Sequence, residues 1–286
     1  MYSSRRASRI LAATGLALCC LPAFADSGAF VVGAGIEADS EDGLAVTVLG
    51  DVAIAENTWL SAAAARSTVD VPRRDDTSTW YGDLSVDRFF DPAGVRLGVA
   101  YWGDSDVLDS TDARLSVYSR GENSYLSIDG ERREFDLVVP PLGPFPGSER
   151  SFGANGLGLS GRLNLNDDVS LRASGMSYEY DVDLDVAETD RVAALLTVSR
   201  LSLLSSLIDW RASVGLDVDF GLSRLSFNVS RWRGAIDDGD NYGATIAYLA
   251  PVSRRADVEV SVGYDDSDLF GDVTIVSVFV YFYGGD

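Results

Sequence analysis

The chain has 286 residues, with 44 acidic and 23 basic side chains, a formal net charge of −21 and no histidine. This acidic balance disfavours nucleic acid as a partner, because proteins that bind nucleic acid need basic surface to neutralise phosphates. The lack of histidine also removes the commonest general base and the commonest metal ligand.

Residues 1–25 are predicted to be a secretory signal peptide. Arg5, Arg6 and Arg9 precede an apolar run that begins at Ile10, and Ala23-Phe24-Ala25 has the A-x-A pattern of a cleavage site. Loss of the three arginines takes the net charge from −21 to −24. Both cysteines lie within the leader, so we expect residues 26–286 to contain neither a disulfide nor a thiolate metal site.

Beyond the leader, most segments alternate apolar and polar residues with a period of two, which predicts β-strands. Changes of apolar parity predict a bulge or small hairpin at Asp129-Gly130 and a slip near Gly175. Residues 181–207 form either a long loop with a helical turn or an additional pair of strands. In chain order, the predicted strands cover residues 30–37, 44–51, 59–68, 80–87, 95–102, 113–118, 125–139, 157–165, 169–180, 208–220, 225–230, 242–248, 258–264 and 272–283.

The clearest of these segments is IDWRASVGLDVDF, residues 208–220. Its odd-numbered positions are polar or small and its even-numbered positions are apolar, so one face is hydrophobic and the other carries charges of both signs. A tilted strand needs roughly 9 to 11 residues to cross a bilayer, and this segment is long enough. We therefore predict a strand that separates lipid from water.

The connections between the predicted strands alternate in length. Short ones fall near residues 55–57, 91–94, 121–123, 166–168, 221 and 251–255, and longer, acidic ones near 37–43, 69–77, 103–111, 140–152, 182–206, 234–240 and 266–271. This is the anatomy of an all-β, antiparallel transmembrane β-barrel with short periplasmic turns and longer extracellular loops. We expect 14 strands, with 12 or 16 as alternatives. A soluble β-sandwich is disfavoured because its strands are usually shorter.

The final strand, Val278-Phe279-Val280-Tyr281-Phe282-Tyr283, resembles the aromatic-rich last strand of Gram-negative outer-membrane barrels. The chain is similar in size to the monomeric 14-stranded porins of that class, although it continues to Gly284-Gly285-Asp286. The resemblance implies export to the outer membrane and recognition of this strand by the barrel-assembly machinery. It also implies contact with outer-membrane lipids and lipopolysaccharide.

If the apolar positions face lipid, the charged positions of opposite parity face the barrel interior. The wall that they form is expected either to select solutes in an open pore or to close the lumen through ion pairs. A set of aromatic residues is expected either to form the interfacial girdles or to pack as ordinary strand residues, and these are Trp59, Trp80, Trp102, Tyr248 and Phe282. The predicted pore-lining residues are Asp51, Asp83, Arg96, Arg114, Tyr118, Arg162, Arg172, Arg211, Asp217, Asp219 and Glu259.

The remaining candidates for chemistry are weak. Aspartates cluster in two predicted loops, but without the spacing of an EF-hand, so solvated loop charge is favoured over a bound Ca²⁺ or Mg²⁺ ion. Neither a catalytic residue nor a cofactor is predicted, since the outer-membrane enzymes that such a chain could resemble use a histidine base. The loop aspartates are Asp181, Asp183, Asp185, Asp237, Asp238 and Asp240.

The sequence therefore predicts a porin-like channel for passive diffusion of small hydrophilic solutes. The alternative is a non-conducting barrel with a structural, adhesive or envelope-integrity role. The acidic balance favours cations at the mouths, whereas interior arginines would reverse this preference at a constriction.

Overall fold

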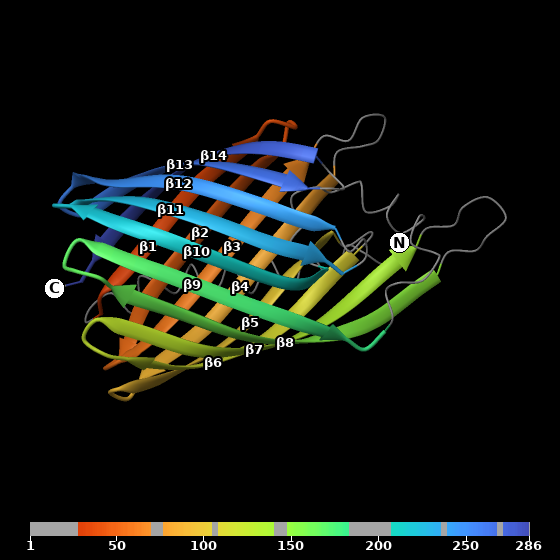
Figure 1. Cartoon of the computed structure of the whole chain (residues 1–286), viewed down its shortest axis with the longest axis horizontal. Coiled ribbons are helices and arrows are strands. Elements are labelled where there is room, and N and C mark those ends of the chain that lie inside the picture. Colours follow the sequence, from red (N-terminus) through yellow and green to blue (C-terminus); the bar gives the residue numbers. More distant parts are fainter. Residues whose placement is uncertain are drawn as a thin grey trace.

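The computed structural model describes residues 28–69, 77–104, 108–139, 148–182, 207–235, 239–267 and 271–285. These residues form a single barrel of tilted strands (Figure 1). They contain no helix that is long and apolar enough to cross a membrane. The strands are β1 (Phe30–Asp39), β2 (Leu44–Ala55), β3 (Thr58–Val69), β4 (Thr77–Phe89), β5 (Ala93–Asp104), β6 (Leu108–Arg120), β7 (Ser124–Val139), β8 (Ser148–Asn164), β9 (Val169–Tyr180), β10 (Ile208–Phe220), β11 (Ser223–Gly234), β12 (Asp240–Ser253), β13 (Ala256–Ser267) and β14 (Gly271–Gly284).

The barrel is closed and antiparallel throughout, which confirms the predicted fold class and strand number. Each strand pairs with its neighbours in sequence, and β14 returns to pair with β1 from Phe30↔Gly284 to Asp39↔Ile275. Closure leaves no sheet edge among the strands, as a barrel surrounded by lipid requires. The end of β14 lies at the rim that carries the short turns (Figure 1). The region 183–206, where an extra strand pair was an alternative, lies outside the described residues.

One parity of the strands forms an exposed apolar belt. Leucine, isoleucine, valine and aromatic side chains alternate along each strand with residues of the other parity, and paired positions on adjacent strands share a face. Such large apolar exposure is atypical of a water-soluble surface and typical of a wall that meets hydrocarbon. Representative outward residues are Ile36, Val46, Leu84, Leu97, Val99, Leu115, Ile128, Leu159, Val214, Val229, Ile246, Val262 and Val278.

The predicted bulge at Asp129-Gly130 is wrong, and so is the predicted slip near Gly175. Strand β7 pairs with β6 and β8 without a register shift, and β9 does likewise with β8 and β10. The apolar parity changes because these strands continue beyond the belt. β7 and β8, at 16 and 17 residues, project further than their neighbours at the rim with the longer loops (Figure 1).

In this projecting part the outward face is charged and the inward face is apolar, the reverse of the arrangement in the belt. The outward side carries Arg132 and Glu134, which form an ion pair with an N–O distance of 2.7 Å. The inward side packs Phe135 against Phe152, with ring centroids 5.0 Å apart. These two rings belong to a buried cluster completed by Leu108, Ala154, Tyr178, Leu207 and Ile208. We call this set the rim cluster, and it places a small apolar core inside the barrel beside the longer loops.

The interfacial girdles include some of the predicted aromatics but not all. Tyr248 and Phe282 are exposed on the outward parity, and Trp80 lies there beneath the guanidinium of Arg66, at 5.2 Å from its ring centroid. Trp59 and Trp102 are on the inward parity, since they pair with Asp87 and Ser110. Their assignment to the girdles is therefore wrong. Apolar residues occupy both faces at the ends of these strands, so alternation does not indicate which face a tryptophan takes.

Placing arginine at Ile246 tests the outward face. The Ile246→Arg variant is expected to lose about 2–4 kcal/mol of unfolding free energy, because its charge would face the middle of the hydrocarbon layer. The adjacent Thr245→Arg variant, whose side chain enters the lumen, is the matched control and should lose far less. Urea unfolding in lipid vesicles measures both. Equal losses, or a larger loss for Thr245→Arg, would show that the two faces have been assigned the wrong way round.

Candidate functional site

The structure places all eleven predicted pore-lining residues on the inward parity. Each pairs laterally with residues on the face opposite to the apolar belt, as Asp51 does with Val31 and Ser61. The candidate site is therefore the inner wall of the barrel, built from alternate residues of every strand. The charge that this wall presents to the lumen depends on which of these residues form ion pairs and hydrogen bonds with one another.

The first group of contacts joins strands β4, β5 and β6. Asp87 accepts a hydrogen bond of 2.9 Å from Nε of Arg96 and a second hydrogen bond from the hydroxyl of Tyr118. Asp83 forms an ion pair with Arg114. Four of the predicted residues are thus held in two clusters, with Asp87 as a partner beyond the predicted set. The alternation of β4 places Asp87 on the same face as Asp83.

The second group joins β9, β10 and β11. Arg172 donates a hydrogen bond of 2.8 Å to Asp217, whose side chain is buried. Ser226 donates to the same carboxylate oxygen, also at 2.8 Å. Asp219 accepts two hydrogen bonds from Arg224, at 2.7 and 3.1 Å. A forked pair of this kind fixes the orientation of both the guanidinium and the carboxylate.

Some predicted residues are not brought together. Asp51 and Arg162 make no hydrogen bond or ion pair with any other residue that the structure describes, and Nε of Arg162 is buried without a partner there. Arg211 contacts the sulfur of Met176, with Nη2 3.9 Å from Sδ, and no described carboxylate. The charged groups of these side chains are therefore able to form hydrogen bonds or ion pairs with a ligand.

A buried ion-pair cluster on β6 and β7 was not predicted. The guanidinium of Arg133 lies 3.3 Å from Asp112 and 3.6 Å from Glu131, and Glu131 also accepts a 2.8 Å hydrogen bond from Tyr178. Arg133 is only 7 % exposed. The local sequence is charged at four consecutive positions, 131–134, so alternation gave no indication of which charges face inward.

Charge is unevenly distributed around the wall. In the described strands, every inward-facing arginine comes from β5–β11, where most are paired with acids. Strands β13, β1 and β2 contribute inward acids without an inward arginine, and these are Glu37, Asp39, Asp51, Asp257, Glu259 and Asp265. The lumen therefore has an arginine wall, on β5–β11, and an acidic wall, on β13, β1 and β2.

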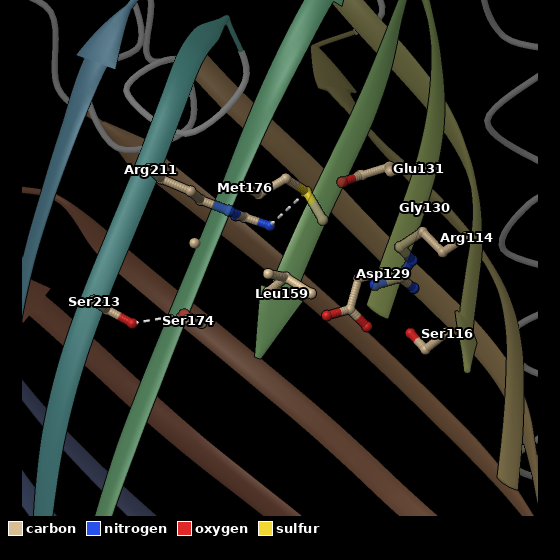
Figure 2. A pocket seen from close by; sticks show the side chains of 11 residues that line it. Arg114, Ser116, Asp129, Gly130, Glu131, Leu159, Ser174, Met176, Arg211 and Ser213 are labelled. Atoms are coloured by element: carbon tan, nitrogen blue, oxygen red, sulfur yellow. Dashed lines mark hydrogen bonds between the residues drawn. The ribbon is translucent and has the colours of Figure 1, made fainter. Parts of the chain in front are cut away.

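A pocket of about 350 Å³ lies in the arginine wall (Figure 2). Its lining includes two arginines, two acids and three serines, from strands β6, β7, β9 and β10. Figure 2 shows Arg211 reaching toward Met176 on one side, with Asp129 on the other. The lining residues with polar side chains are Arg114, Ser116, Asp129, Glu131, Ser174, Arg211 and Ser213.

The structure does not assemble the predicted loop aspartates into a metal site. Asp181 accepts a 2.7 Å hydrogen bond from the backbone of Gly153, and Asp240 forms a 2.8 Å ion pair with Arg231. Asp183, Asp185, Asp237 and Asp238 lie outside the described residues. Within the described part of the chain, no group of three or more acidic, histidine or cysteine side chains could hold a metal ion.

Comparison with known proteins identifies the fold. No family model matches this sequence, and no curated protein matches it. A loop-deletion mutant of OmpT, an outer membrane protein of Vibrio cholerae, aligns over 90 % of this chain and 100 % of its own, with a TM-score of 0.50 and 11 % identity. A Pseudomonas aeruginosa FadL homologue aligns over 90 % of each chain, with a TM-score of 0.51 and 11 % identity. The chain has the fold of an outer-membrane β-barrel protein.

Removing Arg133 should destabilise the barrel. The Arg133→Gln variant leaves Asp112 and Glu131 buried without their cation, and a broken buried ion pair costs about 3–5 kcal/mol. The control is Arg132→Gln, one residue away, whose partners Glu134 and Asp181 are exposed on the outer surface. Unfolding in urea, followed by tryptophan fluorescence, should show a large loss for the first variant and little change for the second. A similar small effect of both would contradict a structural role for Arg133.

Proposed function

We propose that the chain is an outer-membrane channel for passive diffusion of small hydrophilic solutes. The observation that carries this proposal is the inner wall: in a closed 14-strand barrel it is lined by charges and hydroxyls. A barrel of eight strands is narrow enough for side chains to fill, whereas the diameter grows with strand number. A wider barrel with a polar wall provides an aqueous route for solutes.

The proposed orientation follows from the strand connections. The six short turns and the end of β14 lie at one rim and face the periplasm, and the longer loops face the exterior. In this orientation we assign lipopolysaccharide to the rim with the longer loops, where Arg66 and Trp80 lie on the outward face. The assembly machinery is assigned to β14, whose outward residues include Val278 and Phe282.

The uneven charge of the wall supports selection by sign. Acids on the arginine wall are largely neutralised by their partners, whereas Asp51 and Glu259 belong to the acidic wall, which has no inward arginine. Cations would therefore be favoured along the acidic wall. Anions would be favoured beside inward guanidinium groups that form no ion pair with a carboxylate of the described residues, which include those of Arg120, Arg162 and Arg211.

The rim cluster favours a second candidate, a non-conducting barrel with a structural, adhesive or envelope role. Phe135 and Ile208 are almost completely buried inside the barrel at the rim with the longer loops. Side chains packed in this way reduce the open cross-section beside β6–β10.

Conductance separates the two candidates. The refolded residues 26–286, added to a planar lipid bilayer, should produce discrete current steps in potassium chloride. The control is the same protein heat-denatured in detergent, which should leave the bilayer silent. A barrel that is folded, as shown by heat-modifiable electrophoretic migration, and yet produces no steps would overturn the channel proposal in favour of the structural role.

Ion selectivity tests the two walls. The Asp51→Asn, Glu259→Gln double variant should lower the potassium-to-chloride permeability ratio by about two-fold or more, because it removes from the lumen two acids that have no arginine partner among the described residues. Neutralising Arg96, Arg114 and Arg211 together should raise the ratio. Reversal potentials in a salt gradient measure both changes.

The control for the acidic wall is Asp266→Asn, on the same strand as Glu259 but of outward parity. Its reversal potential should equal that of the wild type. Unchanged selectivity in all of the lumen variants, in a protein that conducts, would mean that these residues do not line the path of the ions.

A further inference from the structure

The pocket in the arginine wall exists because β8 presents only small residues to the lumen beneath it. The inward positions of this part of β8 are Ala154, Gly156, Gly158 and Ser160. A Cβ atom on Gly158 would lie 2.9 Å from the terminal methyl of Met176 and 2.8 Å from the carbonyl oxygen of Gly175. Gly158 therefore allows the Met176 side chain to lie directly against β8, and Met176 forms part of the pocket lining. The resulting volume, about 350 Å³, is within the range of small-molecule sites.

Two charges at this pocket lack a partner of opposite sign among the described residues. The only described hydrogen-bond acceptor for the Arg211 guanidinium is the sulfur of Met176, which is a weak acceptor. The carboxylate of Asp129 accepts hydrogen bonds from two hydroxyls, at 2.7 Å from Ser127 and 3.1 Å from Ser160, and from no arginine. Hydroxyls satisfy the oxygens of a carboxylate without neutralising its charge.

The other charges at the pocket are already neutralised. Arg114 is paired with Asp83, and Glu131 lies beside Arg133 and accepts the hydroxyl of Tyr178. Nε of Arg114 is nevertheless buried without a partner. With respect to the residues that the structure describes, the pocket therefore presents one cation and one anion without an ion-pair partner, rather than an excess of either sign.

Strand register places these two charges in one lateral row. Asp129 pairs with Gly158, Gly158 with Met176, and Met176 with Arg211. Strands in a sheet are about 4.8 Å apart, so the ends of this row are separated by roughly 14 Å at the backbone. The guanidinium of Arg211 reaches back over β9, and the carboxylate of Asp129 reaches toward β8. The guanidinium of Arg211 and the carboxylate of Asp129 are therefore separated by one to two strand spacings, on the order of 5 to 10 Å.

We propose that this pocket binds a small zwitterion, an α-amino acid, with its carboxylate on Arg211 and its ammonium group on Asp129. The ligand bridges the row across Met176, whose side chain lies over Gly158, and the hydrogen-bonded hydroxyls of Ser174 and Ser213, 2.8 Å apart, border its carboxylate side. A simple anion would be repelled by Asp129, and a simple cation by Arg211. The inference rests on the proposed function in one respect, because an amino acid reaches this wall only from water inside the lumen.

The test compares three derivatives of alanine that differ in which of the two charges they carry. L-alanine carries both charges, N-acetyl-L-alanine carries only the carboxylate, and L-alanine methyl ester carries only the ammonium group. Calorimetric titration of the refolded protein in detergent micelles should give L-alanine about ten-fold tighter binding than either analogue. This factor is what one additional charge-assisted hydrogen bond supplies in a wet site.

Two variants should remove one half of the site each. Asp129→Asn should weaken L-alanine to the level of N-acetyl-L-alanine, which itself should bind at least as well as before. Arg211→Gln should weaken L-alanine to the level of the methyl ester. The matched control is Arg231→Gln, on the neighbouring strand and of outward parity, which should bind all three probes as the wild type does.

The outcomes distinguish the pocket from the channel. A protein that conducts but binds the three probes equally, or that keeps its preference for L-alanine in both variants, overturns the zwitterion site and leaves the channel standing. A silent barrel that binds L-alanine with the predicted preference supports the site and refutes free diffusion. A folded barrel that neither conducts nor binds overturns both.

Discussion

Every other feature of this molecule depends on the pairing of its first strand with its last. In hydrocarbon, an unpaired backbone amide or carbonyl costs several kcal/mol, so a sheet that meets lipid must have no edge. Here β1 supplies Gly33 and Gly35 opposite Tyr281 and Phe279 of β14, and each aromatic ring lies over the glycine that it faces. The absence of side chains at these two positions gives inward-facing rings room beside the seam.

Once the barrel is closed, a single partition of side chains follows along all the strands. Positions of one parity meet lipid and are apolar, and positions of the other parity meet the lumen and are free to be charged. This partition is strong enough that the strands and the inward direction of residues such as Arg96 and Glu259 could be predicted from alternation, and the strand number followed from the connections between them. The same partition explains where the prediction failed. Beyond the belt the outer face contacts water instead of lipid. Near Arg132 and Phe135, an apolar residue therefore no longer indicates the outward face.

The inner wall could be predicted only in part, because alternation gives the face of a residue and not its neighbours. Asp129 and Arg211 are 82 positions apart in the sequence, and they belong to one lateral row only because of the registers of three successive strand pairs. Register depends on turn geometry and on packing along the whole strand, neither of which appears in a local window. The buried cluster of Arg133, Asp112 and Glu131 was missed because four consecutive charges at 131–134 leave the inward face undefined, and because only the register pairs Arg133 with Asp112.

The inner wall also shows why paired and unpaired charges have different consequences. A pair such as Arg172 and Asp217 holds two adjacent strands in register, and each partner reduces the field that the other projects into the lumen. An unpaired charge projects its field across the water and costs little, because water solvates it. Charges that stabilise the barrel and charges that a solute encounters are therefore largely different residues. By this criterion, the described residues that a solute in the proposed channel would meet include Asp51 and Glu259 on the acidic wall, and Arg162, Arg211 and Asp129 on the arginine wall.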